Sequence, residues 1–139
     1  MSTVVGFHHV HLTCPPGGED ACRTFYGRLL GLTEIPEPSG LAGRGGIWFR
    51  GGPPNSEVEI HVGIEVDFQP ARRAHPGLIV TDLAVMVARL VKAGCPVEPA
   101  SGLPGVHRCH TRDPHGNRVE LLEPIQPTPR QPDGHDQPL

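Results

Sequence analysis

The chain carries one pattern of residues twice, once in each half, and this repetition restricts its fold more than any other feature. The opening and closing runs of the two copies are Phe7–Leu12 with Glu57–Val62, and His75–Val80 with Asn117–Leu122. Each opening contains a histidine and each closing contains a glutamate: His9 and Glu59 are 50 residues apart, and His75 and Glu120 are 45 apart. The sequence therefore predicts two copies of one unit, each contributing an imidazole and a carboxylate.

Alternation, helix caps and turn residues predict the order βαβββ in each half. The first half has a helix that ends at Gly31, and its expected extended segments are residues 4–13, 32–36, 47–50 and 58–65. The second half has a helix that begins after Asp82 and ends at Gly94, and its expected extended segments are 75–81, 95–98, 106–112 and 118–123. We therefore expect an α+β fold in which two tandem βαβββ modules form a curved mixed sheet around a concave cavity.

The length of 139 residues fits a single domain. We expect this domain to cover residues 1–125, with module one at about 4–65 and module two at about 75–124. From residue 126 onward the chain is rich in Pro, Gln, Asp and Gly and has almost no apolar residues, so residues 126–139 are predicted to be a disordered tail.

Charge and cysteine content exclude several classes of partner. The net charge is −3 and the arginines are scattered, which argues against nucleic-acid binding. No apolar run is long enough to span a bilayer, and the N-terminus lacks the pattern of a secretory signal, so we expect no membrane association. The four cysteines show no CxxC spacing and are expected to be reduced thiols in a cytoplasmic protein.

Alternation along the strands places the repeated histidines and glutamates on polar faces. In the first strand His9 and His11 share a face and His8 lies on the opposite one; near the end of module one, Glu59 and His61 share a face. Gathering several ionisable groups in a cavity is costly unless a cation or solvent compensates. Imidazole and carboxylate donors together suit a divalent metal such as zinc, nickel, manganese or iron.

Several segments resemble the vicinal oxygen chelate superfamily, which includes glyoxalase I, extradiol dioxygenases and bleomycin-binding proteins. They are HHVHL, FYGRLLGL, HPGLIVTDLAVMVARLVKAG and DPHGNRVELLEP. The resemblance implies a divalent metal held by His9, His75 and Glu120, with Glu59 as the fourth ligand. His61 lies two residues after Glu59 and competes with it for that role. His11 and His61 lie on the inward strand faces beside the proposed ligands, and together with Trp48 they are expected to line the substrate pocket.

The resemblance is specific for the fold and leaves the reaction open. The leading hypothesis is a metal-dependent lyase or isomerase of glyoxalase I type that acts on a small oxygen-chelating substrate, with Glu120 or Glu59 moving the proton. The alternatives are a dioxygenase with two histidines and one glutamate at its metal, and a non-catalytic drug-binding protein. Members of the superfamily often build the site between two chains, so we expect a homodimer. The linker 67–74 permits either intrachain or exchanged pairing of the modules.

Overall fold

The structure is a computed structural model, and it describes residues 1–41 and 43–126. Module one consists of β1 (Val10–Cys14), α1 (Glu19–Cys22), η1 (Arg23–Leu29), β2 (Thr33–Ile35), β3 (Ile47–Gly51) and β4 (Val58–Ile64). Module two consists of β5 (Gly77–Ile79), α2 (Leu83–Lys92), β6 (Val97–Ala100), β7 (Val106–Arg112) and β8 (Arg118–Pro124). The predicted tail lies outside the described residues, apart from its first residue, 126.

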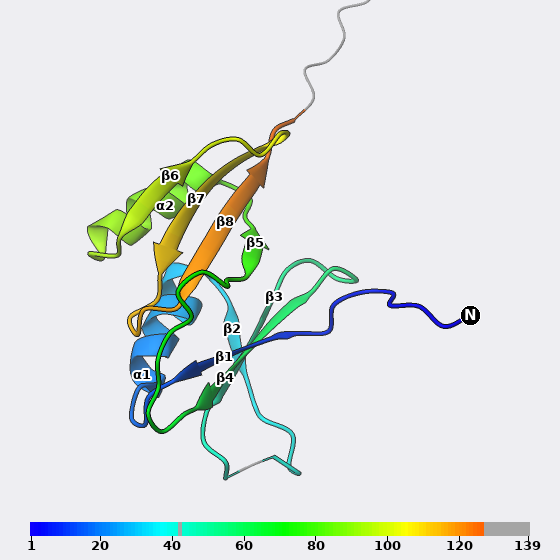
Figure 1. The fold of residues 1–139 in the computed structure, drawn as a ribbon, viewed down its shortest axis with the longest axis vertical. Coiled ribbons are helices and arrows are strands. Elements are labelled where there is room, and N and C mark those ends of the chain that lie inside the picture. Colours follow the sequence, from blue (N-terminus) through cyan, green and yellow to red (C-terminus); the bar gives the residue numbers. More distant parts are fainter. Residues whose placement is uncertain (42, 127–139) are drawn as a thin grey trace, which may run out of the picture.

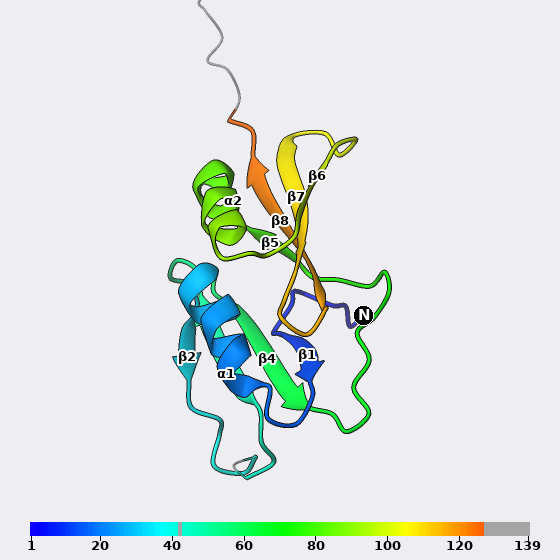
Figure 2. The ribbon, with the colours of Figure 1, turned by 90° about the vertical axis from the view of Figure 1, so that its left-hand side faces the viewer.

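The strands form two four-stranded sheets of identical topology, in the orders β1-β4-β3-β2 and β5-β8-β7-β6. β1 runs parallel to β4, and β5 runs parallel to β8. All other neighbouring strands in the two sheets are antiparallel. The expected α+β fold of two tandem βαβββ modules is thus confirmed. Within one chain the two sheets are separate: module two lies above module one in Figures 1 and 2.

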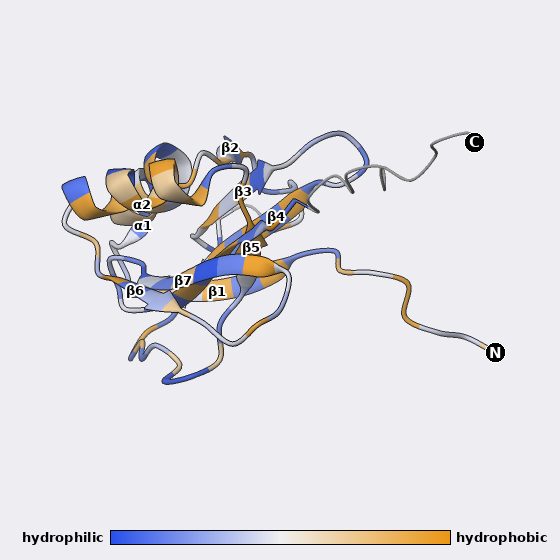
Figure 3. Cartoon of the chain, turned by 90° about the horizontal axis from the view of Figure 1, so that it is seen from above, coloured by the Kyte–Doolittle hydropathy of each residue, from blue (hydrophilic) through white to orange (hydrophobic). Residues whose placement is uncertain are grey.

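The helices cover one side of the two sheets, where the apolar strand faces point. Figure 3 shows α1 and α2 together on that side, and the Arg89 guanidinium of α2 donates to the Leu29 carbonyl of η1 at 3.0 Å. α2 begins at Asp82, whose side chain accepts from the Val85 N–H at 3.0 Å, and the chain leaves the helix at Gly94 with φ +82°. In the described part of the chain, no helix has the length and apolar character needed to cross a membrane.

The first strand is shorter than the alternation predicts. Residues 4–9 form no strand, and β1 begins at Val10, where it pairs with Ile60 of β4. β1 is an edge strand with β4 as its single neighbour, so the segment before Val10 gains no partner within its own chain. This segment runs away from the sheets in Figure 1 and exposes three apolar side chains almost completely: Val4, Val5 and Phe7.

The first helix departs from the regular α-helix expected over residues 19–30. After one turn of α1 the chain widens into the π-helix η1, in which the Leu30 N–H donates to the Phe25 carbonyl at 2.9 Å, an i to i+5 bond. The wider turn buries the consecutive side chains Phe25 and Tyr26, which are 2% and 0% exposed. Tyr26 thereby reaches module two, where its hydroxyl donates to Asp113 at 2.7 Å.

The turn between β7 and β8 fixes the two modules to each other. Its buried Asp113 carboxylate accepts from the Tyr26 hydroxyl, the Asn117 side-chain amide and the backbone N–H groups of His115 and Asn117, at 2.7–2.9 Å. The Asn117 amide also donates to the Thr13 carbonyl of β1 at 2.8 Å. The turn accordingly lies beside α1 in Figure 1 and beside β1 in Figure 2. This buried network, centred on one carboxylate, is therefore an important link between the two modules.

Candidate functional site

Module two brings two histidines and a glutamate together on one face of its sheet. His75 precedes β5, and its Nε2 lies 3.1 Å from Oε2 of Glu120 on β8. His110 of β7 stands directly opposite Glu120 in the antiparallel register. One ligand atom from each of these three residues lies within 4.8 Å of the others. Two imidazoles and one carboxylate are a donor set that suits zinc, manganese or ferrous iron.

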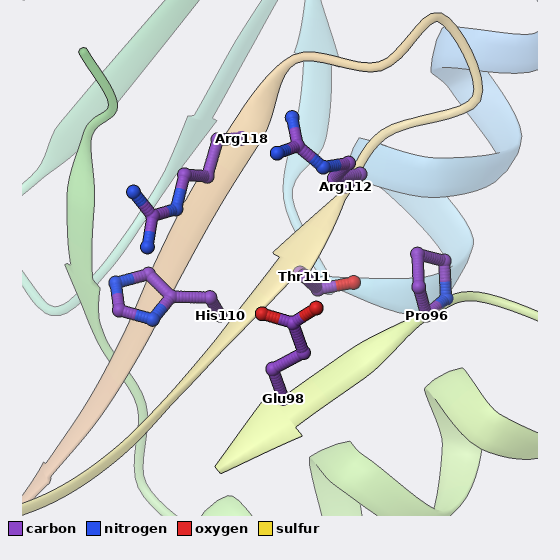
Figure 4. A pocket seen from close by; sticks show the side chains of 6 residues that line it. All are labelled: Pro96, Glu98, His110, Thr111, Arg112 and Arg118. Carbon is purple, nitrogen blue, oxygen red and sulfur yellow. The ribbon is translucent and has the colours of Figure 1, made fainter. Parts of the chain in front are cut away.

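His110 is not among the ligands that the sequence predicts. The available signal was the hairpin register, because residues equally distant from the turn 113–117 oppose each other and share a face. The same row continues to Glu98 of β6, which pairs with His110. Figure 4 shows Glu98, His110 and Arg118 around a small hollow of about 20 Å³. Burial, followed by the nearby Arg118, lowers the pKa of His110 and favours the neutral imidazole that a metal requires.

Glu120 is held in its ionised form by two neighbours. Arg108 donates to Oε1 of Glu120 at 2.8 Å and to the Ser101 carbonyl at 2.8 Å, while His75 contacts Oε2. Burial by itself would raise the pKa of Glu120, but the hydrogen bonds from Arg108 and His75 outweigh it and leave the pKa below its usual value. Glu120 therefore presents a carboxylate at neutral pH, in contact with the His75 ring.

Module one contains a similar arrangement around Glu59. Its carboxylate contacts His61 Nε2 at 3.0 Å and accepts from the Arg50 guanidinium at 3.3 Å. The hydrogen bond from His61, together with Arg50, lowers the pKa of Glu59 despite partial burial. Glu59 and Glu120 thus each lie between one histidine and one arginine, and these neighbours keep both carboxylates ionised.

His61 is the most enclosed of the predicted site residues. Its ring stacks on Trp48 at 3.5 Å between centroids and on His9 at 4.1 Å, and its side chain is 3% exposed. Burial lowers the pKa of His61, so the ring is neutral at pH 7. His61, Trp48, His9, His11 and Arg44 lie around one cavity of about 410 Å³, a volume suited to a small ligand.

His8 was expected to lie on the opposite face from His9, and this expectation is wrong. The Nδ1 atoms of His8 and His9 are 2.8 Å apart, and both residues line the same cavity. Both precede β1, so strand alternation does not apply to them.

The strand register helps to decide whether Glu59 or His61 is the better candidate for the fourth metal ligand. β1 pairs with β4 so that His11 stands opposite His61, and β5 pairs with β8 so that Gly77 stands opposite Glu120. His11 and Gly77 each follow the opening histidine of their module by two residues. If the opening histidines are equivalent, the module-one position that corresponds to Glu120 is His61, and Glu59 lies two residues earlier.

One chain does not bring the four predicted ligands into a single group. Among residues 1–41 and 43–126, the sets of three or more metal-binding side chains within 4.8 Å of one another are His75 with His110 and Glu120, and Cys14 with Cys22 and His115. His9 and Glu59 belong to neither set. Within one chain, the predicted module-one ligands thus lie outside the group that His75 and Glu120 form with His110.

The comparisons with known proteins agree with this architecture. The family model of the Glyoxalase-like domain matches residues 12–122. A protein from Bacillus anthracis that is described as a glyoxalase family member is 39% identical, with a TM-score of 0.80, and the match covers 90% of this chain and 99% of that one. Among curated proteins, none matches the chain.

More distant structures share the fold with different described functions. The fosfomycin resistance protein of Listeria monocytogenes is 12% identical, with a TM-score of 0.68 over 88% of this chain and 96% of that one. An antibiotic binding protein from Streptomyces sp. CB03234 is 18% identical, with a TM-score of 0.63 over 88% of this chain and 100% of that one. From the family match, the repeated modules and these structures, the chain belongs to the glyoxalase-like family of the vicinal oxygen chelate superfamily.

Proposed function

We propose that the protein is a divalent-metal-dependent lyase or isomerase of glyoxalase type that acts on a small oxygen-chelating substrate. The observation that carries this proposal is the contact of 3.1 Å between His75 and a Glu120 carboxylate that Arg108 keeps ionised. His75 and Glu120 by themselves could be an ordinary ion pair that only stabilises the fold. Here, however, a third side chain of a metal-binding type, His110, lies in the same group. Membership of the glyoxalase-like family supports the same interpretation.

The proposed ligands are His75 and Glu120 from module two and His9 from module one, with Glu59 or His61 in the fourth position. A bound divalent cation would polarise a substrate oxygen and stabilise negative charge that develops there. The substrate would occupy the cavity beside His9, His11, His61 and Trp48. Arg44 at the edge of this cavity supplies a positive charge for an anionic group.

Glu59 is the better candidate to carry the proton, and Glu120 the better candidate for a permanent ligand. Both oxygens of Glu120 are engaged, by Arg108 and by His75, in a side chain that is 12% exposed. Glu59 is bound on one side by Arg50, whose side chain is 49% exposed, so this partner is easily exchanged for solvent. If His61 is the fourth ligand, Glu59 is free to accept and return a proton.

Comparing Glu59→Gln with His61→Ala separates these roles. We expect Glu59→Gln to retain the metal and to lose about 100-fold or more in turnover, the usual contribution of a general base. We expect His61→Ala to weaken metal binding, because an imidazole ligand is removed. Metal affinity from chelator competition and turnover are measured on both variants. Metal loss in Glu59→Gln with full retention in His61→Ala would assign Glu59 as the ligand instead.

We also propose a homodimer in which module one of one chain faces module two of the other and completes the site. Within one chain the predicted module-one ligands lie outside the group that His75 and Glu120 form with His110, and β1 and β5 each have one strand neighbour and one free edge. Ile79 of β5 is 78% exposed, beside an apolar hollow of about 600 Å³, and the segment before β1 exposes Phe7. A second chain would cover these surfaces.

Subunit mixing tests the exchanged arrangement directly. The variants His9→Ala and Glu120→Ala should each be inactive on their own. A mixed dimer, however, contains one intact site. In that site, module one comes from the Glu120→Ala chain and module two comes from the His9→Ala chain. After unfolding and joint refolding we expect recovery of about a quarter of the wild-type sites, as random pairing into two-fold dimers gives. Joint refolding that restores neither metal binding nor turnover would contradict exchanged pairing.

The group in module two also favours a second candidate, a ferrous dioxygenase. His75, His110 and Glu120 supply two histidines and one carboxylate from a single module, the set that suits iron and oxygen activation. Oxygen consumption with a catechol by the iron-loaded protein would support this candidate over the isomerase. Tight stoichiometric binding of an antibiotic without product would instead support a binding role, as described for the Streptomyces relative.

We further propose that the protein works in the cytoplasm. All four of its cysteines are free thiols and three of them are buried, which supports a reducing compartment.

A further inference from the structure

A second set of metal-binding side chains lies at the junction of the modules, outside the proposed active site. Cys14 ends β1, Cys22 ends α1, and His115 lies in the turn between β7 and β8. One ligand atom from each lies within 4.8 Å of the others, and both cysteines are 0% exposed. Two segments of module one and one of module two thus meet at this group.

A nearby carboxylate lacks the partner that its burial calls for. Oε1 of Glu19, at the start of α1, is buried and has no hydrogen-bond partner. The charge of Glu19 contributes to the raised pKa of both Cys14 and Cys22, although its oxygens lie outside the group of atoms within 4.8 Å of one another. Buried polar atoms are paired in the great majority of cases, so an unpaired carboxylate oxygen near two buried thiols favours an additional ligand at this junction.

The spacing of these side chains suits a tetrahedral cation. Zinc binds sulfur at about 2.3 Å and nitrogen at about 2.0–2.1 Å, which separates tetrahedral ligand atoms by about 3.3–3.8 Å. The ligand atoms of Cys14, Cys22 and His115 lie within 4.8 Å of one another, so small side-chain rotations close the difference, and the Glu19 carboxylate reaches the same point by a larger rotation. His115 donates from Nε2 to the Gly18 carbonyl at 2.9 Å, and such a bond fixes the tautomer of a ligating imidazole.

The chemistry of the thiols selects the kind of cation. Burial raises the pKa of Cys14 and of Cys22, so in the metal-free protein both carry a proton and neither is a reactive nucleophile. Binding of a thiophilic cation displaces these protons and replaces two buried S–H groups with metal bonds. Hard cations such as magnesium or calcium do not bind sulfur ligands well.

We propose that Cys14, Cys22, His115 and Glu19 form a structural site for zinc that joins the two modules. Four protein ligands fill the tetrahedron and leave no position for a substrate, so the site contributes to folding rather than to turnover. It differs from the His75 and Glu120 site in its donors, since only the junction site has sulfur. The inference therefore stands independently of the proposed catalytic function.

Cobalt substitution distinguishes the two sites, because only thiolate ligands give an intense sulfur-to-cobalt charge-transfer band in the near ultraviolet. We expect this band in the wild-type protein refolded with Co²⁺ and in Glu120→Gln, which retains the junction site. We expect the band to fall to half or less in Cys22→Ser, where at most one thiolate ligand remains, and to keep its full intensity in the matched control Cys109→Ser, which alters a buried cysteine of β7 outside the group. A wild-type protein without the band, or a Cys22→Ser protein with the full band, would overturn the proposal.

Two further measurements protect this test from a variant that fails to fold. The ¹¹³Cd chemical shift of the cadmium-loaded wild-type protein reports sulfur ligands without any substitution, and we expect one resonance in the sulfur-rich range. Glu19→Gln alters an oxygen ligand at the edge of the group and should weaken zinc binding while the far-ultraviolet circular dichroism is unchanged. A cadmium resonance confined to nitrogen and oxygen donors would contradict the assignment.

Discussion

Replacing Glu120 with glutamine should reduce divalent-metal affinity at the candidate site by at least about 100-fold. Removing a residue that only hydrogen-bonds a metal ligand typically lowers metal affinity by about 10–100-fold. Glu120 is proposed to be a ligand itself, so the loss should be at least as large as the upper end of that range. The change keeps the size of the side chain but removes the charge that Arg108 and His75 now surround. Turnover should fall with metal occupancy. Chelator competition measures the affinity, and an assay on metal-saturated protein measures the turnover.

Two exposed residues provide matched controls for this substitution. Glu57→Gln removes a carboxylate from the loop before β4. His107→Ala removes an imidazole from the face of β7 opposite the one that carries Arg108. Both variants should bind metal as the wild type does, since neither side chain points to the cluster of His75, His110 and Glu120. Unchanged affinity in Glu120→Gln would mean that this carboxylate only orders the histidine.

Asp113→Ala should lower the free energy of unfolding by about 4 kcal/mol, the largest stability effect expected here. The carboxylate is 4% exposed and accepts four hydrogen bonds from Tyr26, His115 and Asn117, so alanine leaves buried donors without a partner. Urea unfolding gives the free energy directly. For a chain of this size the melting temperature should fall by about 2–4 °C for each kcal/mol.

Tyr26→Phe is the matched comparison for Asp113→Ala. It removes one donor to the same carboxylate and leaves the ring, which packs against Phe25 and Phe49, in place. The expected loss is about 1.5–3 kcal/mol, as for a single hydrogen bond to a charged group. Equal losses in the two variants would show that the Tyr26 hydroxyl carries the whole effect and that the turn contributes little to the junction.

Local sequence signals predicted the two modules because strand alternation, the Asp82 cap and the glycines after each helix act over a few residues. The same signals placed His75 at the start of one extended segment and Glu120 within another, and the two segments prove to be parallel neighbours. They did not predict η1, whose wider turn is set by the packing of Phe25 and Tyr26 against the sheet. They also placed the start of β1 too early, since pairing with β4 rather than alternation determines where a strand begins.

Contacts between distant segments escaped the sequence analysis. His110 joins the cluster through hairpin register, which depends on the length of the turn between β7 and β8. The sequence predicts Cys14 and Cys22 as reduced thiols but does not connect them with His115, because 93 residues separate Cys22 from His115. That His9 and Glu59 lie outside the group of His75, His110 and Glu120 likewise follows from how the two sheets are assembled.

Metal analysis of the wild-type protein and the Glu120→Gln variant tests the central claim most directly. Both proteins are refolded with excess zinc, freed of unbound metal by gel filtration and analysed for metal per chain. Any zinc at the cysteine site is common to both and cancels in the comparison. The account predicts that the wild type holds about one more equivalent per chain than Glu120→Gln. Equal metal content in the two proteins, with both folded, would contradict a metal site built on Glu120.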